Sequence, residues 1–245
     1  MRVLKNIAGR IWATWGMISF IITFLIFFIP SMFTWVIPDP MGQKIFIGIA
    51  RLWMNIWLRL VGCPVTVRGK EHFKPGETYI VTCNHNSLMD VPISSPFIPG
   101  ANKTIAKSSF AGIPLFGFYY MKGAVLVNRK SEKSRRESFE KMRMVLQKKI
   151  HMCIYPEGTR NRTEEPLKKF HAGAFKLAVS NSNAIIPAII FNSKKALPLH
   201  KTFFLWPQRL QLHFLEAVPV DGLTAEQLQE KIFNIMKDYY VQNRR

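Results

Sequence analysis

Three hydrophobic patterns follow one another along the chain. The first is continuous: residues 11–37 contain no charged side chain, and Ile, Phe, Leu and Trp fill most positions. The second, at residues 44–60, is amphipathic and typical of a helix with one polar face. Its apolar and basic residues recur at helical spacing: Ile45, Ile49, Leu52, Ile56 and Leu60, with Lys44, Arg51 and Arg59. After Gly62-Cys63-Pro64, short apolar runs alternate with amphipathic stretches, as in a soluble α/β domain.

The continuous run has the length and composition of a membrane-associated helix. A helix needs about 20 apolar residues to cross a hydrocarbon core of about 30 Å, and residues 11–29 would just reach across it. A secretory signal peptide has an apolar core of only about 7–15 residues, and a buried core helix is rarely this long and aromatic. We therefore predict that the N-terminal segment associates with a membrane.

Proline positions and charge favour a helical hairpin over a single span. Pro30 and the Pro38-Asp39-Pro40 turn are expected to break the run, so that the second helix returns the chain to the side where it started. Basic residues lie both before and after the run, and a single span would place positive charge on both sides. We predict a membrane-anchoring two-helix segment at residues 1–62, spanning or lying in the interface, and an α/β domain at residues 63–245.

The alternating pattern after residue 62 predicts the class of this domain. Short apolar runs predict strands at residues 65–68, 79–83, 103–106, 124–127, 152–155, 185–190 and 210–215. Helical periodicity predicts helices at residues 131–149, around residues 172–180, and from Thr224, where Thr224 and Gln227 form a capping-box pattern. Strands that alternate with helices favour a mixed, mostly parallel sheet flanked by helices.

The charge of the chain indicates an anionic partner. Its 34 Lys and Arg residues outnumber 15 Asp and Glu residues, for a formal charge of +19, and its 48% hydrophobic content excludes a disordered protein. The apolar N-terminus favours a membrane surface or a phosphorylated lipid over nucleic acid, for which the chain has no recognisable motif. Three cysteines without C-x-x-C spacing argue against a disulfide framework or a zinc site and fit a reducing compartment.

The first candidate for chemistry is a histidine–aspartate pair directly after a predicted strand. His85 could take a proton from an alcohol, and Asp90 could orient the imidazole. Five residues apart on one helix, the two side chains would not meet. They can touch only if His85 lies in a turn before the helix and the chain curls so that Asp90 reaches back, which Asn84 and Asn86 allow. Taken alone, the pair is more typical of a surface turn with a capping aspartate than of a catalytic site.

Two further loops follow predicted strands and carry polar side chains. One contains Arg129, and the other runs from Glu157 through Gly158 to Arg160. Glycine lets the backbone approach a ligand closely, and an arginine fork binds phosphate. Because loops at the carboxyl ends of parallel strands meet at one edge, these residues are candidates for a common site. Taken singly, each arginine is more typical of ordinary surface charge than of a binding site.

Four blocks in order resemble the glycerolipid acyltransferase family, which includes the bacterial lysophosphatidic acid acyltransferases. They are Asn84-His85-Asn86-Ser87-Leu88-Met89-Asp90, Gly123-Ala124-Val125-Leu126-Val127-Asn128-Arg129, Tyr155-Pro156-Glu157-Gly158-Thr159-Arg160 and Ile186-Pro187-Ala188-Ile189-Ile190. Shorter stretches around Lys107, Pro114 and Lys169 are similar as well, and the resemblance covers residues 65–220.

The resemblance implies an O-acyltransferase that moves a fatty acyl chain from acyl-CoA or acyl carrier protein to lysophosphatidic acid. The product would be phosphatidic acid, made in phospholipid biosynthesis on the cytoplasmic face of a cell inner membrane, with the bilayer as partner and without nucleic acid, metal or cofactor. His85 would be the general base and Asp90 its orienter. The implied substrate-binding residues are Lys107, Arg129 and Arg160 for the phosphate and Glu157, Gly158 and Thr159 around the glycerol.

Departures from the family pattern leave the acceptor open. Asn128 stands where the second block usually has aspartate, and Ser109 where a glutamate often follows the lysine. Both remove negative charge near the expected phosphate site, so glycerol-3-phosphate, another lysophospholipid or a lyso-ornithine lipid are alternative acceptors. A membrane-anchored basic lipid-binding protein would explain the charge and the apolar run, but it would leave His85, Asp90 and the glycine–arginine loop without a role.

Overall fold

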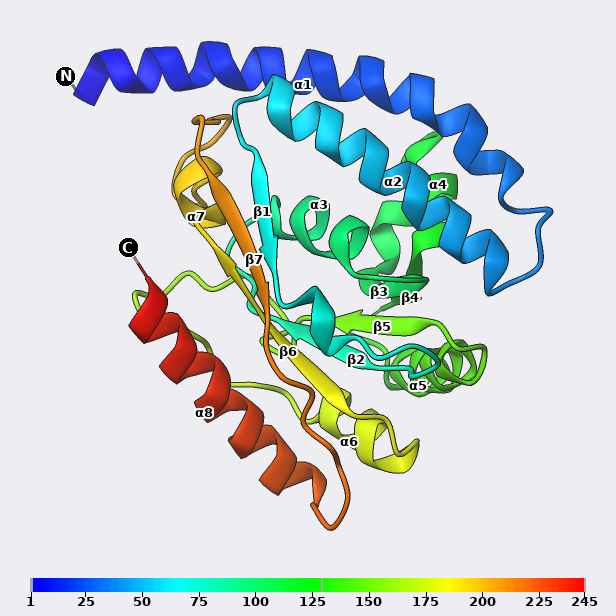
Figure 1. Cartoon of the computed structure of the whole chain (residues 1–245). Coiled ribbons are helices and arrows are strands. Elements are labelled where there is room, and N and C mark those ends of the chain that lie inside the picture. Colours follow the sequence, from blue (N-terminus) through cyan, green and yellow to red (C-terminus); the bar gives the residue numbers. More distant parts are fainter. Residues whose placement is uncertain (1, 129, 245) are drawn as a thin grey trace.

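In the computed structural model, which describes residues 2–128 and 130–244, the chain forms a seven-stranded sheet covered by helices on both faces (Figure 1). The strands are β1 (Val65–Arg68), β2 (Ile80–Cys83), β3 (Asn102–Lys107), β4 (Ala124–Val127), β5 (His151–Ile154), β6 (Ile185–Phe191) and β7 (Leu210–Phe214). The α-helices are α1 (Arg2–Phe33), α2 (Met41–Leu60), α3 (Asp90–Ser94), α4 (Phe116–Gly123), α5 (Glu132–Gln147), α6 (Gly173–Ser180), α7 (Ser193–Ala196) and α8 (Ala225–Asn243). Short 3-10 helices lie at η1 (Lys70–His72), η2 (Ser95–Phe97) and η3 (Ser108–Gly112).

The sheet is mixed and mostly parallel, as predicted. Its strand order is β1-β7-β6-β2-β5-β3-β4, and the five strands from β6 to β4 run in the same direction. Strand β7 runs antiparallel to β6, and β1 runs parallel to β7. The central strands β2, β5 and β6 are buried along their whole length, which explains their continuous apolar runs. Because the five strands from β6 to β4 are parallel, their carboxyl ends meet at one edge of the sheet.

Two hydrophobic cores lie on opposite faces of the sheet. Helices α2, α3 and α4 contribute Trp57, Ile93 and Phe116 to the first core. Helices α5, α6 and α8 contribute to the second, in which Phe175 and Ile232 are completely buried. Helix α8 begins with the predicted capping box, in which the Thr224 hydroxyl and the Gln227 side chain each accept a backbone N–H.

The N-terminal helices form the predicted hairpin, and α2 belongs to the core of the domain. Tryptophan indoles join the pair: Trp12 and Trp15 of α1 donate to backbone carbonyls at the end of α2, and Trp57 of α2 donates to the Gly16 carbonyl at 3.1 Å. The prediction that Pro30 breaks the first helix is wrong, because α1 continues to Phe33. Proline removes one backbone donor from the helix, and only three helical residues follow it before α1 ends. The division of the chain at residue 62 stays a prediction.

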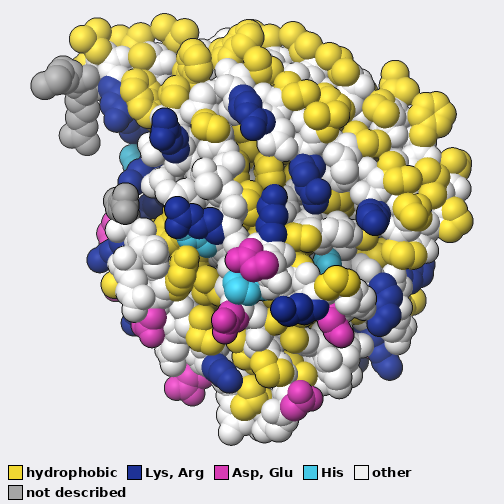
Figure 2. Space-filling model, viewed as in Figure 1, with side chains coloured by type: hydrophobic (Ala, Val, Ile, Leu, Met, Phe, Trp, Pro, Cys, Tyr) yellow, Lys and Arg dark blue, Asp and Glu magenta, His cyan; other side chains and the backbone are white. Residues whose placement is uncertain are grey.

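Helix α1 exposes an apolar surface along its length. Of the described residues, only 3–33 form a helix long and apolar enough to cross a membrane by length and composition. One stripe of α1 packs on α2, while Ile11, Ile18 and Leu25 on the outer side are 66%, 46% and 48% exposed. Figure 2 shows this hydrophobic surface over α1 and the turn into α2, with Lys and Arg side chains on the face below. Such a large exposed patch is typical of a surface that contacts another apolar phase.

Secondary structure follows the sequence pattern closely, with three exceptions. Every predicted strand is present, with ends that differ by one residue at most, and the three predicted helices of the domain are α5, α6 and α8. The short helices α4 and α7 were not predicted, and α3 is a single turn that begins only at Asp90. These helices are too short for a helical period to stand out in the sequence.

Candidate active site

The histidine–aspartate pair meets as the sequence predicts. His85 lies in the turn after β2, and its Nδ1 is 2.8 Å from Oδ2 of Asp90, the first residue of α3. The histidine side chain is 18% exposed and the aspartate is fully buried. With Nδ1–H donating to the carboxylate, Nε2 keeps a free lone pair, as a general base requires.

The Asp90 carboxylate is held by the turn that it organises. The same oxygen, Oδ2, also accepts the backbone N–H groups of Asn86 at 2.6 Å and Ser87 at 2.7 Å. Its second oxygen, Oδ1, is buried and has no hydrogen-bond partner among the described residues. Three donors on one oxygen hold the carboxylate in place and leave the imidazole little freedom to rotate.

The backbone of His85 is fixed by the loop after β5. Its N–H donates to Oε1 of Glu157 at 2.8 Å, and its carbonyl accepts the Asn161 N–H at 2.6 Å. The neighbouring Asn84 side chain is fully buried and bonds both the N–H and the carbonyl of Ile190 in β6. The turn that carries the imidazole is therefore fixed both to the loop after β5 and to β6. Asn84 and Asn161 were not predicted to have these roles, because their partners are distant in sequence.

Glu157 faces the protein interior rather than an open site. It is 1% exposed, and its second oxygen, Oε2, accepts the Lys168 N–H at 3.1 Å. Burial raises the pKa of Glu157 to about 7, although the two backbone donors act to lower it. With both carboxylate oxygens bonded to backbone, this side chain joins the His85 turn to the loop after β5.

We expect Glu157 to make stability depend on pH. Its pKa is 4.5 without the fold and about 7 within it, so between these values the folded protein binds more protons than the unfolded one. The free energy of unfolding should therefore fall as pH rises through this window, by up to about 3 kcal/mol. Denaturant unfolding at pH 5 and pH 8 measures this fall, which should be absent in Glu157→Gln. The exposed Glu226→Gln control should keep the wild-type slope, and an equal slope in Glu157→Gln would contradict the expectation.

An aromatic ring that the sequence did not single out covers one face of the His85 imidazole. The rings of Tyr155 and His85 are stacked, with centroids 4.5 Å apart and planes 30° apart. The Tyr155 hydroxyl is hydrogen-bonded to Oγ of Ser94 at 2.6 Å. Burial raises the pKa of Tyr155 well above its ordinary value, so the phenol stays neutral. A neutral ring can position the imidazole and favour the imidazolium through its π-face.

Removal of the Tyr155 ring is expected to lower kcat while KM stays unchanged. Cation–π contacts contribute about 0.5–2 kcal/mol, so Tyr155→Leu should turn over roughly 3–30-fold more slowly. Tyr155→Phe keeps the stacked ring and loses only the bond to Ser94, so it should retain most of the activity. Steady-state kinetics of both variants measure the difference. Equal losses in the two variants would indicate that the hydroxyl matters rather than the ring.

The predicted phosphate ligands follow neighbouring strands of the same edge. Lys107 ends β3 and is exposed, and Arg160 is half-buried in the loop after β5. Neither side chain has a hydrogen bond or an ion pair with the described part of the chain. Arg129, the third predicted phosphate ligand, lies outside the described residues. Two cations at the site edge are thus available for an anionic group.

Gly158 and Thr159 form the bend between Glu157 and Arg160. Gly158 has φ +69°, a conformation that favours glycine, and an added Cβ would come within 2.7 Å of the His171 ring. The Thr159 hydroxyl accepts a hydrogen bond from Nζ of Lys168 at 2.6 Å. His171 and Lys168 therefore belong to this bend, although only the glycine could be singled out from the sequence.

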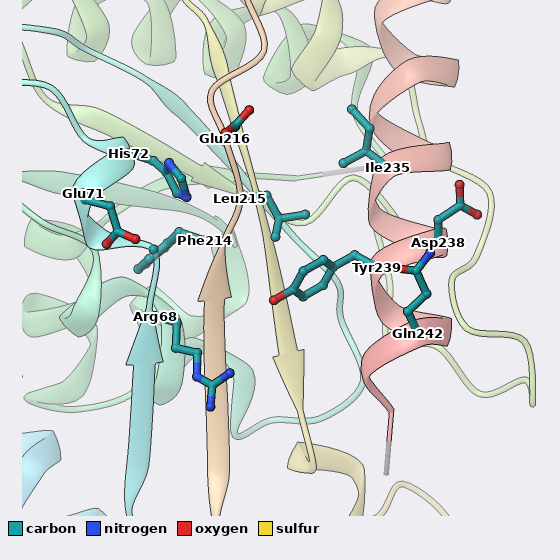
Figure 3. A pocket seen from close by; sticks show the side chains of 11 residues that line it. Arg68, Glu71, His72, Phe214, Leu215, Glu216, Ile235, Asp238, Tyr239 and Gln242 are labelled. Carbon is teal, nitrogen blue, oxygen red and sulfur yellow. The ribbon is translucent and has the colours of Figure 1, made fainter.

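Other titratable clusters lie away from this edge. A hollow of about 510 Å³ is lined by residues including Arg68, His72 and Tyr239, between edge strand β1 and helix α8 (Figure 3). Strands β6 and β7 separate it from β2, and its lining includes none of the predicted site residues.

Within residues 2–128 and 130–244, no three His, Cys, Asp or Glu side chains are grouped to hold a metal ion, and Cys63, Cys83 and Cys153 are free and buried.

The fold and the histidine–aspartate turn define a class of enzyme. The model of the Acyltransferase family matches residues 64–191, just over half of the chain, and this protein belongs to that family. Human 1-acyl-sn-glycerol-3-phosphate acyltransferase alpha is 30% identical over 169 residues, which are 68% of this chain and 59% of the human protein. The 1-acyl-sn-glycerol-3-phosphate acyltransferase of Cocos nucifera is 32% identical over 139 residues, which are 56% of this chain and 44% of the coconut protein. The chain thus spans less than two thirds of these curated relatives.

A solved structure shares the whole fold. The 1-acyl-sn-glycerophosphate (LPA) acyltransferase PlsC from Thermotoga maritima superimposes with a TM-score of 0.80, covering 99% of this chain and 97% of that chain. Its sequence identity to this protein is 21%, so the likeness concerns the fold. The superposition includes the N-terminal helices, because the coverage leaves almost no residue unmatched in either chain.

Proposed function

We propose that this protein transfers a fatty acyl chain from an acyl thioester to the sn-2 hydroxyl of 1-acyl-glycerol-3-phosphate, forming phosphatidic acid in phospholipid biosynthesis. The observation that carries the proposal is the 2.8 Å contact between His85 Nδ1 and Asp90 Oδ2, at the edge where Lys107 and Arg160 also lie. Membership of the Acyltransferase family and the printed names of the relatives support this choice of reaction and acceptor.

The proposed mechanism uses His85 twice. Nε2 takes the proton of the acceptor hydroxyl as its oxygen attacks the thioester carbonyl, and Asp90 stabilises the imidazolium that forms. When the tetrahedral intermediate collapses, the carbon–sulfur bond breaks and the imidazolium returns the proton to the leaving thiolate. A thioester is already activated, so a base worth roughly 10²–10⁴-fold and a well-positioned acceptor suffice without metal or cofactor.

In this proposal the acceptor phosphate lies between Lys107 and Arg160, with Arg129 as the third ligand. The support is the placement of two unpaired cations after the adjacent strands β3 and β5. Gly158 and Thr159 would border the glycerol, where the absence of a Cβ lets the backbone approach. Glu157 would act indirectly, through the His85 backbone that it binds.

The membrane would bring the lipid substrate to this edge. Helix α1 would lie in the interface of the inner membrane with its apolar surface in the acyl region, and the domain of residues 63–245 would face the cytoplasm. A net charge of +19 would hold the domain against an anionic leaflet, at about 1 kcal/mol for each Lys or Arg near the surface. The polar donor, acyl-CoA or acyl carrier protein, would then arrive from the cytoplasm.

The test is acyl transfer in liposomes from labelled acyl-CoA and acyl carrier protein to a panel of acceptors. Lysophosphatidic acid is expected to be acylated faster than glycerol-3-phosphate, a lyso-ornithine lipid or an uncharged lysolipid. Preference for another acceptor would keep the enzyme class and overturn the acceptor proposed here. No transfer to any acceptor by the folded protein would instead favour a basic lipid-binding protein.

Loss of Arg160 is expected to weaken selectively the use of a phosphorylated acceptor. A charge-assisted hydrogen bond contributes about 1.5–3 kcal/mol, so Arg160→Ala should lower kcat/KM for lysophosphatidic acid roughly 10–100-fold. The small activity on an uncharged lysolipid should stay unchanged. Arg162→Ala is the matched control, because Arg162 is exposed two residues further along the same loop. Equal losses on both acceptors would show that Arg160 does not bind the acceptor phosphate.

A further inference from the structure

An apolar tip lies in the segment that runs from the end of β3 into the first turn of α4, outside the N-terminal hairpin in sequence. The chain carries no charged side chain between Lys107 and Lys122. Within this stretch Ile113, Leu115 and Phe118 are 44%, 45% and 59% exposed, and these three residues are called the apolar tip. Exposed consecutive apolar residues lower solubility and are retained where they contact another apolar surface.

The backbone bends sharply to hold the tip outward. The Phe116 N–H donates to the Pro114 carbonyl at 2.6 Å, so that Leu115 is the central residue of a γ-turn with φ +57°. A leucine rarely adopts this conformation, and a glycine would adopt it without strain. The Gly117 that follows has no space for a Cβ, which would lie 2.2 Å from the Ala111 carbonyl oxygen. The presence of leucine at a position suited to glycine indicates that its exposed side chain has a use.

The tip lies next to α1, because residues adjacent to its members in the sequence pack against that helix. Phe116 packs on Phe24 of α1, with ring centroids 5.7 Å apart, and Tyr119 packs on both Phe24 and Phe46 of α2. Figure 1 accordingly places α4 next to the hairpin, beneath the C-terminal half of α1. At its other end the tip connects through η3 to Lys107 at the catalytic edge. It therefore lies between the membrane-facing helix and the proposed phosphate site.

We propose that Ile113, Leu115 and Phe118 insert into the acyl region of the bilayer as a second membrane contact beside α1. The inference rests on the membrane-facing function proposed above and adds an orientation to it. A single helix lying in the interface leaves the domain free to roll about the helix axis. A second contact next to α1 prevents this rotation and turns the edge that carries Lys107 and His85 toward the lipid headgroups.

The first experiment measures the depth of the tip directly. A single environment-sensitive dye is attached to full-length Phe118→Cys; the three native cysteines are buried and should not react. In phosphatidylcholine–phosphatidylglycerol vesicles the dye emission should shift to the blue and be quenched by lipids brominated in the acyl chain. Met144→Cys is the control, because Met144 is a similarly exposed apolar residue, 51% exposed, on α5. Equal responses at the two positions, or no response at position 118, would overturn the proposal.

A second variant separates membrane contact from folding and catalysis. Leu115→Gly removes the side chain and relieves the backbone, so thermal stability should be about unchanged. The lipid concentration for half-maximal vesicle binding should rise roughly 10-fold, while transfer to a water-soluble short-chain acceptor is retained. Loss of that transfer would place the tip in the substrate site and overturn the proposal. A blue shift without vesicles, together with a dimer in light scattering, would assign the tip to a second copy and overturn it as well.

The dye measurement requires no turnover, so the inference and the proposed function can fail separately. An inserted tip in a protein without acyl transfer would leave the inference standing and contradict the function. Full acyl transfer with a dye that stays in water would support the function and contradict the inference.

Discussion

Replacement of His85 by alanine is expected to lower kcat roughly 10²–10⁴-fold in a protein that remains folded. The reason is that Nε2 is the group left free for proton transfer once Nδ1 is bonded to Asp90. The loss should fall on kcat more than on KM, because in the proposed mechanism the imidazole acts on a hydroxyl that Lys107 and Arg160 position. Its side chain is partly exposed and its structural bonds are made by its backbone, which alanine keeps.

Acyl transfer by equal amounts of wild-type and variant protein in the same liposomes measures this effect. Strands β7 and β6 separate β1 from β2, which leads into the His85 turn. His72→Ala serves as the control, because His72 lines the hollow beside β1 (Figure 3). It should keep wild-type activity. Folded His85→Ala protein with full activity would rule out the base proposed here, whatever the acceptor.

Most of the architecture could be predicted because its causes are local in sequence. Strands buried on both faces must be apolar throughout, so β2, β5 and β6 are visible as short apolar runs. Helices that cover a sheet need one apolar stripe, which identifies α5 and α8. The direction of β7 and its place between β1 and β6 have no such signal, because strand pairing depends on residues far apart in the chain.

The candidate site could be predicted in outline for the same reason. The spacing of His85 and Asp90, combined with the preceding strand, showed that the two side chains could meet only through a turn, and the structure has that turn. What the spacing could not reveal is how the turn is held. Glu157 binds the His85 backbone across 72 positions of sequence, and Asn84 binds β6 across 106. Contacts of this kind arise only after the sheet has assembled, and they link the chemistry to the stability of the whole domain.

Substitution of Asp90 by asparagine is the second change expected to have a large effect, roughly 10³–10⁴-fold on kcat by analogy with the serine–histidine–aspartate template. The carboxylate oxygen Oδ2 accepts three donors, from the His85 ring and from the Asn86 and Ser87 backbone. An amide oxygen in its place could still accept them, but it would carry no charge to stabilise the imidazolium. The amide nitrogen would then occupy the buried position of Oδ1, which has no partner among the described residues.

The Asp90→Asn variant should therefore lose both stability, through the unbonded amide nitrogen, and activity, and the two losses can be measured independently. Leaving it without an acceptor should lower the free energy of unfolding by about 1–3 kcal/mol, which denaturant unfolding detects. The loss of kcat should persist at a temperature where the variant is fully folded, and KM for the acceptor should change little. If the lost activity instead returned in full on cooling, Asp90 would act only by holding the turn. A stable Asp90→Asn protein with wild-type kcat would show that the imidazole needs no charged partner.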